Sequence, residues 1–159
     1  VARALRGVAC CRRRAAGEPL AYLSGHQEFR GLDLLVDPRV LIPRPDTETL
    51  VDWALDVLAG HAGATVVDLG TGSGAIALAL KHARPDLHLC ALDASGEALS
   101  VARHNAQRLR LEVQFLQGCW LDGVPGRFHA IVSNPPWAAE RVRAAAAHGA
   151  LHPERRGRI

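Results

Sequence analysis

The chain has 159 residues, of which 48% are hydrophobic and 22% charged, and its formal net charge is +3. This composition fits a globular protein able to bury a core, while the charge is too small to indicate nucleic-acid binding and no apolar run is long enough to span a membrane. The four cysteines form no C-x-x-C pair, which argues against a zinc cluster and favours a reducing compartment. We therefore expect a cytoplasmic protein, or a mitochondrial one if the source is eukaryotic.

The N-terminal part predicts a helix followed by a hairpin. Residues 1–16 read as the end of a helix that Gly17 closes, and residues 18–25 read as a connector. Apolar residues then alternate with polar ones around Gly31, which indicates a short β-hairpin built on Phe29, Leu32, Leu34 and Val36.

A second helix is predicted to begin near Asp46, a candidate N-cap. Helical spacing predicts that its apolar face comprises Leu50, Trp53, Ala54, Val57 and Leu58.

Strands and helices alternate over the rest of the chain. Strands are expected at 64–69, 87–92, 111–116 and 128–133, and helices at 75–83 and 95–109. This alternation predicts an α/β fold with a mainly parallel sheet.

A glycine-rich loop follows the first of these strands, with the sequence Gly70, Thr71, Gly72, Ser73 and Gly74. Glycines allow positive φ and a close approach of the backbone to a ligand. Asp93 ends the next strand, where an acid can accept both hydroxyls of a ribose. The pattern predicts an adenosine-containing cofactor at the carboxyl edge of the sheet; a structural turn with a capping aspartate is the simpler alternative.

Two cofactors compete for this loop. Gly70, Gly72 and Ala75 satisfy the G-x-G-x-x-A pattern of dinucleotide binding. Asp68, two residues before the loop, is poorly placed beside a pyrophosphate and suits the ammonium of S-adenosylmethionine (AdoMet). We therefore favour AdoMet.

The fourth strand is followed by the tetrad Asn134, Pro135, Pro136 and Trp137. The prolines stiffen the turn and leave it rich in carbonyl acceptors, the asparagine adds an amide oxygen, and the tryptophan adds a flat wall. These features suit a planar group that carries an N–H₂, and they indicate methyl transfer to nitrogen. A rigid turn at a strand end is the alternative.

Each of three further residues fits two alternative roles. Trp120 either packs beside adenine or caps the core. Asp46 and Glu48 are candidate site carboxylates, although capping of a helix N-terminus is their simpler role.

The chain resembles the release-factor glutamine methyltransferases (the PrmC/HemK family) from about residue 13 to residue 137. The segments that carry the resemblance are residues 18–25 (E-P-L-A-Y-L-S-G), 41–48 (L-I-P-R-P-D-T-E), 68–74 (D-L-G-T-G-S-G), Asp93, Asn105 and residues 134–137 (N-P-P-W).

The resemblance implies a class I AdoMet-dependent methyltransferase fold, Rossmann-like, here truncated after its fourth strand. Residues 1–25 would be the end of an N-terminal helical domain and its linker, residues 26–45 a β-hairpin connector, and residues 46–159 an incomplete methyltransferase domain. We accordingly interpret the chain as a fragment.

The implied activity is N5-methylation of the glutamine in the G-G-Q motif of class 1 peptide-chain release factors. AdoMet would contact Gly70 to Gly74 and Asp93, Trp120 would border the adenine, and residues 134–137 would hold the glutamine amide. An RNA or DNA N-methyltransferase with the same tetrad, and a non-catalytic AdoMet-binding remnant, are the alternatives. Cys119 stands where the family usually has an acid, and Trp137 where tyrosine is usual.

Overall fold

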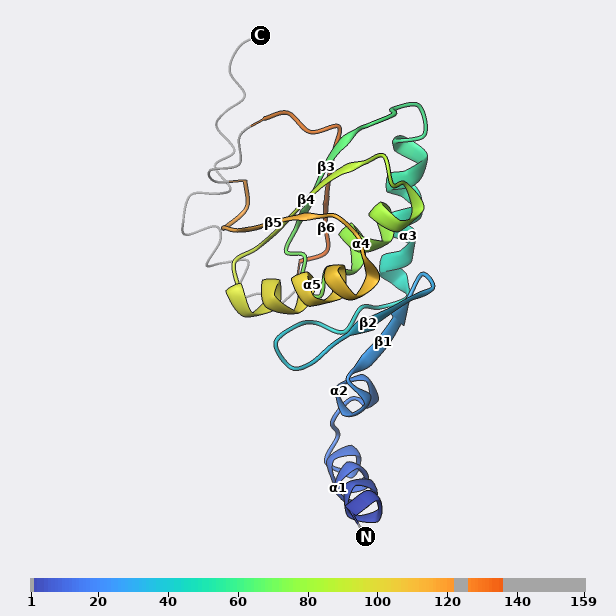
Figure 1. Cartoon of the computed structure of the whole chain (residues 1–159), viewed down its shortest axis with the longest axis vertical. Coiled ribbons are helices and arrows are strands. Elements are labelled where there is room, and N and C mark those ends of the chain that lie inside the picture. Colours follow the sequence, from blue (N-terminus) through green and yellow to red (C-terminus); the bar gives the residue numbers. More distant parts are fainter. Residues whose placement is uncertain (1, 122–125, 136–159) are drawn as a thin grey trace.

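The computed structural model describes residues 2–121 and 126–135. Two helices, α1 (Ala2–Ala15) and α2 (Leu20–Ser24), lie at the N-terminal end and are separated from the main sheet by a hairpin (Figure 1). Gly17 adopts a φ of 93° after α1, as expected of a residue that closes a helix. The connector predicted at residues 18–25 contains the short helix α2, which the sequence did not indicate.

The hairpin consists of β1 (His26–Phe29) and β2 (Leu32–Leu35), paired antiparallel so that Phe29 faces Leu32. Its two turn residues, Arg30 and Gly31, both have positive φ, at 48° and 76°, which is the geometry of a tight two-residue hairpin turn. The apolar side chains of this hairpin are buried in the main core, so the hairpin is packed against the sheet domain and is not a free linker.

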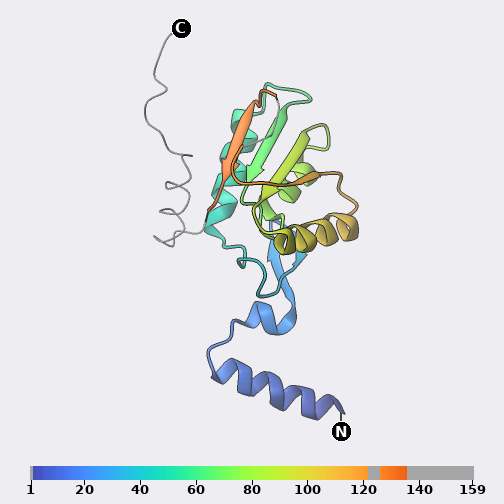
Figure 2. The same cartoon turned by 90° about the vertical axis from the view of Figure 1, so that its left-hand side faces the viewer.

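The main sheet is parallel, with the strand order β5-β4-β3-β6. Its strands are β3 (Thr65–Leu69), β4 (His88–Asp93), β5 (Gln114–Gln117) and β6 (Ala130–Ser133). The predicted α/β class is confirmed, and the structure places β6 beside β3 (Figure 2).

Two of these strands begin two or more residues later than predicted. Residues 111–113 are not paired, because Arg110 adopts a left-handed conformation and the amide of Leu111 still donates to Ala106 O at 3.0 Å, which closes the preceding helix. Residues 128 and 129 likewise precede β6, although the amide of His129 donates to Thr65 O at 2.8 Å.

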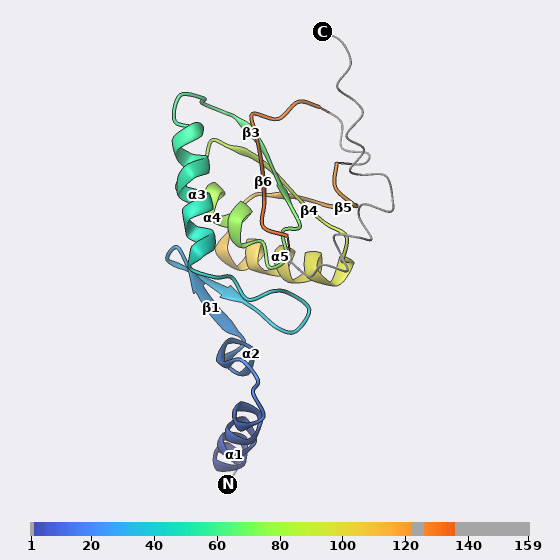
Figure 3. The ribbon, with the colours of Figure 1, turned by 180° about the vertical axis from the view of Figure 1, so that it is seen from behind.

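Three helices pack with one face of the sheet: α3 (Asp46–Val57), α4 (Ala75–Ala83) and α5 (Gly96–Leu109). Alternate residues of β3 divide between two clusters, with Val66 in the helix-covered core and Val67 in the cluster on the other face. Seen from behind, α3 runs alongside β6 (Figure 3). None of the helices in the described part of the chain has both the length and the apolar character needed to cross a membrane.

The structure corrects the prediction for α3 in two ways. Pro45 occupies the N-cap position, and Asp46 is the first helical residue without a side-chain capping bond. The buried face is displaced from the predicted one, since Trp53 and Val57 are 62% and 46% exposed while its buried members are Thr47, Val51, Ala54 and Leu58.

Candidate active site

Three parallel strands end together at one edge of the sheet. Leu69 is in register with Leu92 of β4 and with Ser133 of β6. The next residues along the three strands are therefore neighbours: Gly70, Asp93 and Asn134. The structure thus brings together the glycine loop, the acid and the start of the tetrad.

The glycines of the loop have two different roles. Gly70, Gly72 and Gly74 have φ values of 72°, 57° and 85°, a region that other residues rarely adopt. A Cβ at either of the first two would meet nothing within 4 Å, whereas at Gly74 it would lie 3.0 Å from Leu78 Cδ1 and 3.3 Å from Ala102 Cβ. Gly70 and Gly72 therefore border open space, while Gly74 allows α4 and α5 to pack closely.

Asp93 connects this loop to the start of α5. Its Oδ2 accepts from the amide of Gly72 at 2.9 Å, and its Oδ1 accepts from the amide of Ser95 at 2.9 Å. A carboxylate offers about four lone-pair positions, so these two bonds leave acceptors for a ligand. Asp93 thus has the structural role that was its simpler alternative, since it accepts hydrogen bonds from the loop and from the start of α5. Its role in binding ribose stays a prediction.

Asp68 lies beneath the loop and is wholly buried. Its Oδ2 accepts from Thr71 Oγ1 at 2.6 Å and from the amide of Ala77 at 3.3 Å. Its Oδ1 is the one buried side-chain polar atom of the described residues that has no hydrogen-bond partner. Burial chiefly raises the pKa of this carboxyl, to about 6; the bonds from Thr71 and Ala77 act against this rise, and the charge of Asp93 adds slightly to it. The negative charge on the unpartnered oxygen favours an ammonium group of a ligand nearby. A direct contact between Asp68 and a ligand stays a prediction.

Asn134 is held by α3. Its Nδ2 donates to Thr47 Oγ1 at 2.9 Å. The neighbouring residue is also fixed, because Ser133 Oγ donates to Leu69 O at 2.8 Å. Sequence reasoning did not single out Thr47, although it belongs to the P-R-P-D-T-E run that contributed to the resemblance.

For the remaining predicted residues that it describes, the structure gives a position but no contact that indicates a role in the site. Trp120 has a φ of 55° and is 39% exposed, and both of its predicted roles stay predictions. Glu48 Oε1 lies 3.4 Å from the amide of Arg30, in a contact with the hairpin turn. Pro135 directly follows Asn134, whereas Pro136 and Trp137 lie outside the described residues.

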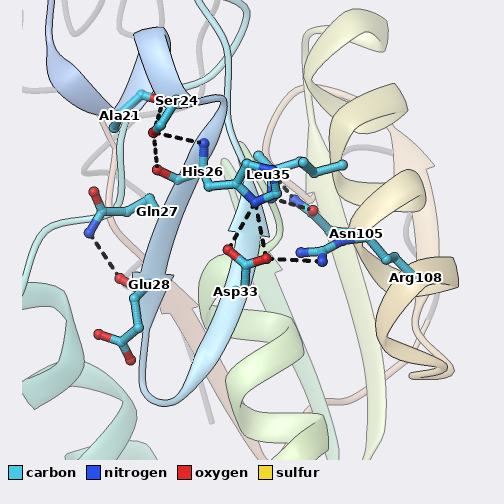
Figure 4. A network of polar contacts seen from close by, with 9 residues as sticks. All are labelled: Ala21, Ser24, His26, Gln27, Glu28, Asp33, Leu35, Asn105 and Arg108. Atoms are coloured by element: carbon cyan, nitrogen blue, oxygen red, sulfur yellow. Dashed lines mark hydrogen bonds and ion pairs between the residues drawn. The ribbon is translucent and has the colours of Figure 1, made fainter.

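The hairpin is fastened to the same loop by Asn105, which is wholly buried in α5. Its Oδ1 accepts from the amide of Leu35 at 2.8 Å, and its Nδ2 donates to Leu35 O and Ser73 O, both at 3.0 Å. Near it at the surface, Asp33 contacts both His26 and Arg108 (Figure 4), and these two groups lower the pKa of its carboxyl. Asn105 was part of the resemblance, but its role as a bridge could not be inferred from sequence.

A large hollow of about 960 Å³ lies elsewhere, between α5 and the sheet, with Thr65 and His88 of the strands' amino ends in its wall. It contains none of the predicted site residues. The site is therefore assigned from the strand register and the hydrogen bonds, not from the volume of this hollow.

A parallel sheet with a glycine-rich loop after β3, an acid at the end of β4 and an N-P turn after β6 is the arrangement of a class I methyltransferase-like fold. The chain belongs to the methyltransferase small domain family, whose family model matches residues 47–153.

Curated relatives carry a more specific name. The chain is 49% identical over 155 residues to a release factor glutamine methyltransferase of Burkholderia pseudomallei, a match that covers 92% of this chain and 54% of the relative. It is 48% identical over 131 residues to the protein of the same name from Escherichia coli, covering 81% of this chain and 47% of that one. The chain spans about half the length of the curated relatives it matches.

Solved structures support the fold. A ribosomal protein L11 methylase from Lactobacillus delbrueckii subsp. bulgaricus aligns with a TM-score of 0.54 at 29% identity, over 63% of this chain and 51% of that chain. TrmN from Thermus thermophilus aligns with a TM-score of 0.52 at 28% identity, over 59% of this chain and 30% of that one.

Proposed function

We propose that this chain forms part of an AdoMet-dependent methyltransferase that modifies the side-chain amide nitrogen of a glutamine. The proposed substrate is the G-G-Q motif of class 1 peptide-chain release factors, and the proposed place of action is the cytoplasm. The observation that carries the proposal is the position of Asn134 beside the glycine loop and Asp93, at the carboxyl edge of the sheet. The names of the relatives at 48–49% identity support the choice of substrate.

The residues present fit AdoMet. Gly70 and Gly72 leave open space over the loop, Asp93 retains acceptors for ribose hydroxyls, and the unpartnered Asp68 oxygen suits a positive group. We assign cofactor binding to these residues together with Thr71, Ser73, Gly74 and Trp120. A dinucleotide would instead bring a pyrophosphate towards the carboxylate of Asp68, which is unfavourable.

When bound, AdoMet supplies an electrophilic methyl group on a positively charged sulfur. An amide nitrogen is a poor nucleophile because its lone pair is delocalised into the carbonyl. We assign two acceptors to its two N–H bonds, Asn134 Oδ1 and the carbonyl oxygen of Pro135, which together favour a pyramidal nitrogen and fix its direction of approach. Positioning of this kind can contribute about 7–11 kcal/mol to lowering a barrier. Pro136 and Trp137 would complete the wall of this subsite.

A methyl-transfer assay with tritiated AdoMet tests the proposal. For activity measurements we use a chimera, in which this chain is joined to those segments of the Burkholderia pseudomallei relative that lie outside the match. This chimera is what we call the full-length protein. A release factor should accept label, and its variant with the G-G-Q glutamine replaced by alanine should not. Label in tRNA or DNA alone would instead establish a nucleic-acid methyltransferase, and AdoMet binding without transfer to any of the three would establish a non-catalytic module.

A further inference from the structure

We infer that Thr47 is a positioning residue, which turns the amide of Asn134 so that its oxygen faces the incoming nitrogen. The inference rests on the proposed function for its catalytic consequence, but the contact itself is observed. Thr47 Oγ1 accepts from Asn134 Nδ2 at 2.9 Å, across 87 residues of sequence.

The hydrogen bond determines which end of the amide is available. With Nδ2 directed at Thr47, the other end of the group is Oδ1, and no donor among residues 2–121 and 126–135 bonds to it. A nitrogen that carries two N–H bonds requires an acceptor. If the Asn134 amide were turned over, its own N–H₂ would face the N–H₂ of the substrate, and two donors cannot bond to each other.

Thr47 is itself well fixed. It lies in the first turn of α3, its amide donates to Arg44 O at 3.0 Å, and it is 8% exposed. It is the polar member of a buried helix face whose other members are Val51, Ala54 and Leu58. A threonine side chain in a helix has two main rotamers, and burial together with the bond from Asn134 selects between them. The polar group thus occupies a position where a hydrophobic residue would otherwise complete the face.

Replacement of Thr47 by valine removes the hydrogen bond to Asn134 while preserving the shape of the side chain. In Thr47→Val a methyl group replaces the acceptor, so Asn134 Nδ2 must turn or move towards water to satisfy its hydrogens. We expect kcat for glutamine methylation to fall about ten- to hundredfold, as misplacement of a group in the site can do. The dissociation constant for AdoMet should stay within about twofold, because the hydrogen bonds of Thr47 within the described residues run to Asn134 and Arg44 and not to the loop. Thr47→Ser keeps the hydroxyl and should retain most of kcat.

Thr49→Val is the matched control. Thr49 lies on the same helix two residues on, is exposed, and undergoes the same chemical change. It should leave kcat, KM and the melting temperature unchanged. Equal losses of kcat in Thr47→Val and Thr47→Ser would overturn the inference, because a hydroxyl-dependent role requires rescue by serine.

Nuclear magnetic resonance separates this inference from the proposed function. The side-chain N–H₂ of Asn134 in the 159-residue chain should exchange with solvent at least about tenfold faster in Thr47→Val than in wild type or Thr47→Ser. Unchanged exchange in Thr47→Val would overturn the inference even if activity were lost. If the wild type fails to methylate release factor but this exchange pattern is seen, the proposed function is wrong and the positioning of Asn134 by Thr47 stands.

Discussion

The amide of Gly72 donates to Asp93 Oδ2 at 2.9 Å, and this bond joins the loop after β3 to the end of β4. Asp93 therefore has a structural role without any ligand, because its carboxylate fixes the position of Gly72 in the middle of the loop. A residue of this kind has two measurable roles, in loop geometry and in ligand binding, and suitable controls distinguish them.

Asp93→Ala should weaken AdoMet binding at least about tenfold, because ribose hydroxyls lose an acceptor at a cost of about 1–3 kcal/mol. Asp86→Ala is a matched control, since Asp86 Oδ2 also accepts a loop amide, that of Gly63, at 2.9 Å. Titration calorimetry should show unchanged affinity for the control. Equal affinity in wild type and Asp93→Ala would contradict the ribose assignment, and tight binding of NADH would replace AdoMet as the cofactor.

Gly72→Ala tests whether the open side of the loop is the ligand side. Gly72 and Gly63 have φ values of 57° and 64°, and a Cβ on either would meet nothing within 4 Å. Alanine should therefore cost a similar amount of stability at both positions, about 1–2 kcal/mol from the left-handed backbone alone. Only Gly72→Ala should also reduce AdoMet affinity. Equal AdoMet affinities in the two variants would mean that the ligand does not approach this face of the loop.

Asn134→Ala in the full-length protein should lower the rate of glutamine methylation about a hundredfold or more, the usual effect of removing a transition-state hydrogen-bonding group. AdoMet affinity should be nearly unchanged, because Asn134 is assigned to the substrate amide. The measurement is single-turnover methyl transfer combined with calorimetry. A variant that methylates at the normal rate would show that the tetrad acts in some other way.

The stability of the protein should depend on pH through Asp68. Its pKa rises from 3.8 to about 6 on folding, so the native state favours the protonated form. The stability that this preference contributes is complete below pH 4 and is lost as the pH rises through about 6. The difference in unfolding free energy between Asp68→Asn and wild type should therefore increase in favour of the variant by on the order of 2 kcal/mol between pH 4.5 and pH 7.5. Urea melts at pH 4.5 and 7.5 measure it, and a difference independent of pH would show that Asp68 is charged at both.

Asn105→Ala should loosen the hairpin. It leaves Leu35 N, Leu35 O and Ser73 O without their partner, at a cost of roughly 3 kcal/mol or more. Hydrogen exchange should show the amide of Leu35 losing protection, with Gln107→Ala on the exposed side of α5 as the control. Equal protection of that amide in both variants would contradict the bridging role.

Much of the fold could be predicted because its signals are local. The change from strand to helix periodicity after residue 64 and the glycines of the loop define β3, α4, β4 and α5 nearly residue by residue. That Asn134 and the loop lie at the same edge follows from the rule that parallel strands share a carboxyl edge, whereas their adjacency depends on the pairing of β6 with β3.

The buried face of α3 could not be chosen in the same way. The helix has more apolar residues than one face requires, and only contact with the core distinguishes Val51, which is buried, from Trp53, which is not. The bonds of Thr47 to Asn134 and of Asn105 to the hairpin are equally invisible in sequence, because they join residues 87 and 70 positions apart.

These separations also set the order in which the site can assemble as the chain is synthesised. The bond between Gly72 and Asp93 spans 21 residues and is available as soon as β4 has emerged. The bond between Thr47 and Asn134 spans 87 residues, so the threonine must wait until β6 has been made. Loop closure over the longer span costs more entropy and comes later. The nascent protein can therefore form its predicted cofactor loop before its predicted amide-binding residue has been made, and a chain whose synthesis halts between residues 95 and 133 contains the first and lacks Asn134.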